Sequence, residues 1–259
     1  MKKWLTSGWF VVLLLAFVQC DRCKDPVVDP PAKSTDARYQ FHWNSVFDQQ
    51  DLVQGQTYYD YLNRRFLLED LRGYVSQIKV YNDLDSSLVL KDYALLNWFT
   101  DPTISVNATP WKVTKIEFSL GVPADVNTAT DPTTYANSHP LSVAGSSGMF
   151  WTWNTGYIFY MLNGKTDLTG SNTAPLTDPL AYHCGDDTLY RTLTFYPNPI
   201  ETKAGESYTW NFEFNARKCF LNDTDTLHFD TEYLTHTTGN LPLAIKAMDL
   251  YQSAFHLVP

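Results

Sequence analysis

The sequence predicts an all-β domain built as a sandwich of two sheets, and three observations support this prediction. Apolar and polar residues alternate with a two-residue period in several segments, as they do in strands with one buried face. Stretches rich in Pro, Gly, Asn and Asp separate these segments, which is typical of a sandwich rather than of alternating strands and helices. Only one stretch, near the C-terminus, carries convincing helix signals.

The predicted strands follow one another along most of the chain. The clearest is 208–214 (YTWNFEF), in which every second residue is aromatic. The other alternating segments are 39–43, 74–81, 115–120 and 189–195, and two continuous apolar runs are 87–90 and 157–162. Aromatic residues make up 15% of the chain, which is enough material for a large core. We therefore expect a single immunoglobulin/cupredoxin-like β-sandwich.

The segment 241–255 (LPLAIKAMDLYQSAF) predicts a short C-terminal helix. Asn240 is a favourable N-cap residue, and Pro242 fits the first helical turn. No further helix breaker occurs before Phe255. The partial apolar stripe of this helix favours packing against the sandwich.

The N-terminus predicts export. Lys2 and Lys3 precede the apolar run 9–18 (WFVVLLLAFV), which is shorter than the about twenty residues that span a bilayer. This pattern fits a secretory signal peptide over residues 1–19. Cys20 closes the run where a bacterial lipoprotein carries its lipidated cysteine, although Gln19 departs from the small residue usual before it. The alternative is a soluble secreted protein that is cleaved further along the chain.

A linker and one domain follow the signal. Residues 20–36 are rich in proline and charge and lack a hydrophobic period, as expected of a lipid-proximal linker, and the domain spans 37–259. The net charge is −9 without a basic cluster, which argues against nucleic acid as a partner. We expect the domain in the cell envelope, anchored by lipid to the membrane, at the outer membrane or the periplasmic face.

The cysteines predict one disulfide. If Cys20 carries a lipid, Cys184 and Cys219 are the natural pair within the domain, and Cys23 of the linker is left over. Such a bond would contribute about 3–4 kcal/mol in the chain-entropy model. Metal ligation by Cys184 is the alternative, but no second cysteine lies at CxxC spacing.

Local motifs for catalysis or metal binding are weak. The six histidines include no HxH or HxxxH pair, so no local metal signature is present. His183 is the strongest single candidate because it lies at a predicted strand end beside a glycine. No GxSxG motif occurs, so an envelope hydrolase is the least favoured hypothesis for the function. The sequence favours a binding protein rather than an enzyme.

The segment 148–157 (GMFWTWNTGY) has the most distinctive composition. Trp151 and Trp153 are two residues apart, so their indoles lie on one face of an extended strand. They belong either to the core or to a site, as an aromatic platform or as an oxidisable tryptophan beside a metal.

This segment resembles the Met-x-Trp-x-Trp-x-x-Gly-Tyr signature of the MbnP-like copper-binding family, named for a methanobactin-associated protein, with Tyr157 as its tyrosine. Further pieces resemble family segments in the same order, and they are 72–80, 116–122 (IEFSLGV), Pro140-Leu141, 182–185 (YHCG) and 247–256. The resemblance covers the chain from about residue 39 to its end.

The resemblance implies a β-sandwich of the bacterial envelope that binds copper through histidines. It also implies an oxidised tryptophan (kynurenine), which a dihaem peroxidase-like partner produces. The candidate ligands are His183 with His42 or His139. Copper-binding members carry histidine at two positions occupied here by Thr128 and Phe150, so copper binding does not follow from the resemblance alone. The alternative is a metal-free sandwich that serves as a surface binding or interaction module.

The position of Cys20 generates the first testable prediction. Replacement Cys20→Ser should move the protein from the membrane fraction to the soluble periplasmic or secreted fraction, because the acceptor of the lipid is lost. Fractionation followed by a high-salt wash measures this. A variant that stays membrane-bound after the wash would disprove lipidation at Cys20.

Overall fold

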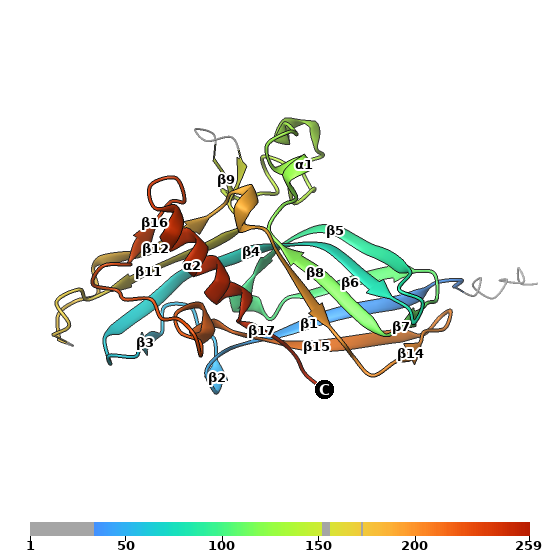
Figure 1. Ribbon diagram of the computed structural model, residues 1–259, viewed down its shortest axis with the longest axis horizontal. Helices are drawn as coiled ribbons and strands as arrows, with labels where there is room; N and C mark the ends of the chain where they lie inside the picture. The colour runs from blue at the N-terminus through green and yellow to red at the C-terminus, as the bar shows by residue number, and fades with distance from the viewer. Residues whose placement is uncertain (1–33, 152–155, 172) are drawn as a thin grey trace, which may run out of the picture. The chain divides into compact units, whose positions relative to one another are not determined.

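The computed structural model describes residues 34–151, 156–171 and 173–259 (Figure 1). This part of the chain consists mainly of strands in several sheets, with one α-helix longer than a single turn. The predicted all-β sandwich with a short C-terminal helix is therefore confirmed. The predicted signal peptide, Cys20, most of the linker and Trp153 lie outside the described residues.

The first sheet is built around β1 (Ala37–Phe47). Its strand order is β17 (Phe255–Leu257), β15 (Ser207–Asn215), β1 and β2 (Gln50–Asp51), and β6 (Thr103–Ala108) also pairs with β1. β1 and β15 pair in parallel, with Phe41 opposite Trp210 and Trp43 opposite Phe212. The alternating aromatics of both strands therefore lie on the same face of the sheet.

The second sheet is built around the long strand β4 (Arg65–Tyr81). Its order is β13 (Arg191–Phe195), β8 (Lys115–Leu120), β4, β11 (Tyr160–Thr166), β12 (Asp178–Cys184) and β16 (Leu234–Thr235), and β3 (Thr57–Tyr59) and β5 (Ser87–Asn97) also pair with β4. The register of β4 shifts before Lys79, next to Gln77, whose φ is 51°. This bulge bends β4 within its second half.

Short elements complete the described chain. Two strand pairs are β7 (Lys112–Val113) with β14 (Ile200–Glu201) and β9 (Phe150–Trp151) with β10 (Gly156–Tyr157). The helices are α1 (Ala124–Asn127), α2 (Leu241–Gln252) and the 3-10 turns η1 (Trp98–Thr100), η2 (Pro132–Thr134), η3 (Asp187–Leu189) and η4 (Ala216–Cys219). None of the described helices has the length and apolarity needed to cross a membrane.

Helix α2 begins as predicted and ends earlier than predicted. The Asn240 side chain accepts a hydrogen bond from the Leu243 amide, which is the expected N-cap contact. The helix ends at Gln252 rather than at residue 255, because Phe255 opens β17 and pairs with Phe214 of β15. The C-terminal segment thus changes from helix to strand within a few residues.

Aromatic side chains fill the core between the sheets. Trp43 of β1 contacts Phe118 of β8 edge-on, with ring centroids 5.7 Å apart. Trp43 also stacks on Phe212 at 5.4 Å and lies near Trp98 at 6.2 Å. All four side chains are fully buried. Edge-to-face and offset stacking of this kind stabilises the packing of the sheets beyond the burial of surface.

Helix α2 is fixed to the second sheet through Tyr251. Its ring stacks on Tyr160 of β11 at 4.1 Å, and its hydroxyl accepts a hydrogen bond of 3.1 Å from the Trp98 indole. Gly73 of β4 makes room for this ring, because a Cβ atom there would lie 2.1 Å from the Tyr251 hydroxyl oxygen. The close approach requires glycine at position 73.

This contact generates a double-mutant prediction. Gly73→Ala should destabilise the fold by about 1–3 kcal/mol through overpacking. Tyr251→Phe should cost about 1–3 kcal/mol by leaving the Trp98 indole unpaired. The double variant should be more stable than the sum predicts, by on the order of 1 kcal/mol, because Tyr251→Phe removes the clashing oxygen. Denaturant unfolding measures all three free energies.

The control is Tyr58→Phe, whose hydroxyl bonds to Val53 rather than facing Gly73. Its effect should add to that of Gly73→Ala. If the changes in unfolding free energy of Gly73→Ala and Tyr251→Phe were additive, a clash between position 73 and the Tyr251 hydroxyl would be ruled out.

Candidate functional site

The structure does not bring together the three histidines that the sequence singles out. His42 lies on β1, where its Nδ1 is 2.9 Å from the Thr103 hydroxyl. His139 stacks on the Tyr135 ring at 4.2 Å, and its Nδ1 accepts a hydrogen bond from the Leu141 amide. His183 lies on β12 of the second sheet. Within residues 34–151, 156–171 and 173–259, no group of three or more His, Cys, Asp or Glu side chains could hold a metal.

His183 has a different histidine as its neighbour. The rings of His183 and His236 are perpendicular, at 89°, and their centroids are 4.6 Å apart. The parallel pairing of β12 with β16 places Tyr182 opposite Thr235. His183 and His236, which follow these two residues, are therefore adjacent as well. Sequence reasoning missed His236, because nothing in the local pattern indicates this parallel pairing.

Side-chain hydrogen bonds hold the His236 segment against β12. The Thr237 hydroxyl donates to the His183 carbonyl and accepts from the Gly185 amide, each at 2.9 Å. The Tyr182 hydroxyl donates to the Glu232 carbonyl at 2.6 Å. These contacts flank the histidine pair on both sides and fix the distance between the two rings.

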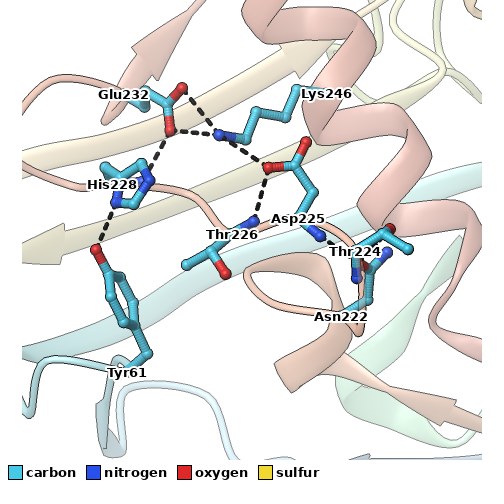
Figure 2. Close-up of polar contacts among 8 residues, drawn as sticks. All are labelled: Tyr61, Asn222, Thr224, Asp225, Thr226, His228, Glu232 and Lys246. Atoms are coloured by element: carbon cyan, nitrogen blue, oxygen red, sulfur yellow. Dashed lines mark hydrogen bonds and ion pairs between the residues drawn. The ribbon is translucent and has the colours of Figure 1, made fainter.

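A polar cluster ties the same segment to α2 and to the loop before β4 (Figure 2). Lys246 of α2 donates to Glu232 at 2.8 Å and forms an ion pair with Asp225 at 3.2 Å. Burial alone would lower the pKa of Lys246, but the hydrogen bonds to both carboxylates raise it above its usual value. On the other side, the Tyr61 hydroxyl bonds to Nδ1 of His228. The cluster anchors the segment before His236 at several points.

The His183 ring is hydrogen-bonded and mostly shielded from water. Its Nε2 is 2.8 Å from Oδ1 of Asn163 on β11. Met161, which is buried, lies directly opposite His183 in the β11–β12 pairing. Burial, together with the nearby His236, lowers the pKa of His183 to about 4. The imidazole is therefore uncharged at neutral pH, which is the form that binds metals.

Arg72 of β4 lies opposite Met161, on the side away from His183. Its guanidinium binds the Asp70 carboxylate in two places, at 2.7 and 2.6 Å, and donates to the Ser147 carbonyl at 2.7 Å. Its Nη2 also lies 3.4 Å from the sulfur of Met161. The Asp70–Arg72 pair is internally neutral, so it adds no net charge beside His183.

Two tyrosine hydroxyls bind the loop that precedes the signature segment. The Tyr157 hydroxyl donates to the Leu141 carbonyl at 2.5 Å, and the Tyr74 hydroxyl donates to the Pro140 carbonyl at 2.9 Å. Trp151 is buried against Gly185, where a Cβ atom would lie 3.1 Å from its ring. The signature tryptophan therefore packs two residues from His183.

The two positions that depart from the copper-binding pattern lie together. Thr128 and Phe150 both line a surface pocket of about 690 Å³, beside Asn127 and Val143. A hydroxyl and a phenyl ring do not replace two imidazoles as copper ligands. The residues of this pocket therefore do not fit copper.

The predicted Cys184–Cys219 disulfide is not present, and both thiols are free and buried. Burial raises the pKa of Cys219 to about 12 and that of Cys184 well above its usual value. Thiolate is the form that reacts in disulfide exchange, so burial disfavours the reaction. The hydroxyl of Tyr160 is close to both thiols within the core.

Comparisons with known proteins identify the family of this chain through a family model. A family model described as MbnP matches residues 36–255. The solved structure of MbnP from Methylosinus trichosporium matches with a TM-score of 0.47 and 14% identity, covering 73% of this chain and 78% of that chain. No curated protein sequence matches the chain. Because the family model covers most of the domain, the chain belongs to the MbnP family.

Proposed function

We propose that this protein is a copper-binding member of the MbnP family in the bacterial cell envelope, and that His183 and His236 hold the metal. It acts as a binding protein, exported by its signal peptide and anchored by a lipid on Cys20. The single observation that carries the proposal is the pair of imidazoles of His183 and His236, whose ring centroids are 4.6 Å apart.

The spacing and chemistry of this pair suit copper. Imidazole nitrogen is a favoured copper ligand. Metal–nitrogen bonds are about 2.0 Å long, so two nitrogens about 4 Å apart can share one ion. His183 is uncharged at neutral pH, so metal binding displaces no proton from it. The thioether of Met161 lies opposite His183 and adds a soft group that favours the reduced ion.

The expected partner and the oxidised tryptophan belong to the same proposal. A dihaem peroxidase-like protein would act on a signature tryptophan. Of the two candidates, Trp151 packs against Gly185, two residues along the chain from His183. Copper would supply a redox-active centre when bound, and the protein would contribute the two imidazoles.

A second function is favoured by the pocket at Thr128 and Phe150. Its lining lacks the histidines of the copper-binding members and includes the exposed side chain of Val143. Loss of the two histidines is expected of a metal-free protein that keeps the sandwich and binds a partner through this pocket. Copper binding by the purified protein distinguishes the two functions.

The proposal predicts stoichiometric Cu(I) binding. The purified mature protein should take one Cu(I) from a chromogenic Cu(I) chelator, and competition should give its affinity. His183→Ala and His236→Ala should each weaken binding by more than about 100-fold, because each removes one of two nitrogen ligands.

The matched control is His42→Ala, which removes a histidine from the other sheet and should leave the affinity unchanged. Circular dichroism checks that each variant remains folded. Wild-type protein that binds no Cu(I), or His236→Ala with unchanged affinity, would contradict the proposed site and favour the metal-free function.

A further inference from the structure

Asn163 occupies a defined place beside His183. In the antiparallel pairing of β11 with β12, Asn163 lies opposite Ala181, and Met161 lies opposite His183. The four side chains therefore point to one face of the sheet. On that face, the amide Oδ1 of Asn163 is 2.8 Å from Nε2 of His183.

This contact determines which ring nitrogen carries the proton. An amide oxygen accepts hydrogen bonds and cannot donate one. Nε2 must therefore carry a proton, because it lies within hydrogen-bond distance of an oxygen that can only accept. The lone pair that remains free for a metal is then on Nδ1.

We propose that Asn163 is a positioning residue, which holds His183 in the Nε2–H tautomer and leaves Nδ1 as the metal-binding nitrogen. The metal-binding part rests on the proposed function, whereas the tautomer does not. Hydrogen bonds from ligand imidazoles to neighbouring oxygens commonly fix ring orientation and strengthen metal binding in this way.

The neighbouring carboxylate binds Arg72 instead. Asp70 of β4 lies opposite Asn163 in the β4–β11 pairing. Both of its oxygens are already engaged by Arg72, at 2.7 and 2.6 Å. Asn163 is therefore the acceptor for His183, and as a neutral group it adds no charge to the partly buried ring.

Nuclear magnetic resonance of the metal-free protein tests the tautomer directly. At neutral pH, long-range ¹H–¹⁵N spectra should show Nε2 of His183 protonated and Nδ1 unprotonated. Asn163→Leu should convert this into a mixture of tautomers, whereas Asn163→Asp should preserve it, because a carboxylate still accepts the bond. Asn163→Ala serves if the leucine variant does not fold.

Thr103→Val is the matched control. It removes the hydroxyl next to Nδ1 of His42 and should alter only the His42 signals. A wild-type spectrum with Nδ1 of His183 protonated, or an unchanged spectrum in Asn163→Leu, would overturn the proposal.

Copper affinity tests the second half. Asn163→Leu should weaken Cu(I) binding about 10- to 100-fold, and Asn163→Asp should restore it. An affinity within twofold of wild type in the leucine variant would overturn the positioning role. If wild-type protein binds no copper, the proposed function fails, while the tautomer spectrum still decides what Asn163 does to His183.

Discussion

Strand β4 hydrogen-bonds to four other strands, and the rest of the second sheet depends on this shared pairing. Its first half pairs with β3 and β11, and its second half pairs with β5 and β8. The bulge beside Gln77 lies within the second half, where the register shifts. β11 in turn pairs with β12, and β12 pairs with β16. The pairing of β12 with β16 brings His183 and His236 together, and the pairings of β4 with β11 and of β11 with β12 place Arg72 and Met161 beside His183.

The two-residue period of these strands separates the core from the site. On the inner face, Gly73 and Tyr160 lie against Tyr251 of α2, whose ring is fully buried. On the outer face, Arg72, Met161 and His183 lie opposite one another across three strands. The same alternation that buries the aromatic core thus presents charged, thioether and imidazole groups together. The charged and imidazole groups of the outer face therefore stay out of the aromatic core.

Much of the fold was predictable from the sequence, because alternation in segments such as 208–214 and 115–120 directly reports a half-buried strand. The N-cap at Asn240 was predictable for the same local reason. The partner of His183 was not, because β16 has only two residues and its parallel pairing joins distant parts of the chain. The expected disulfide is absent, and cysteine parity alone could not show that Cys184 and Cys219 remain free thiols in the core.

The central claim is that one copper ion is held between His183 and His236. X-ray diffraction from crystals of the copper-loaded protein, measured on both sides of the copper absorption edge, tests it most directly. The account predicts a single anomalous peak between these two rings. A peak beside Thr128 and Phe150 or at His42 or His139, or no peak in copper-loaded crystals, would contradict it.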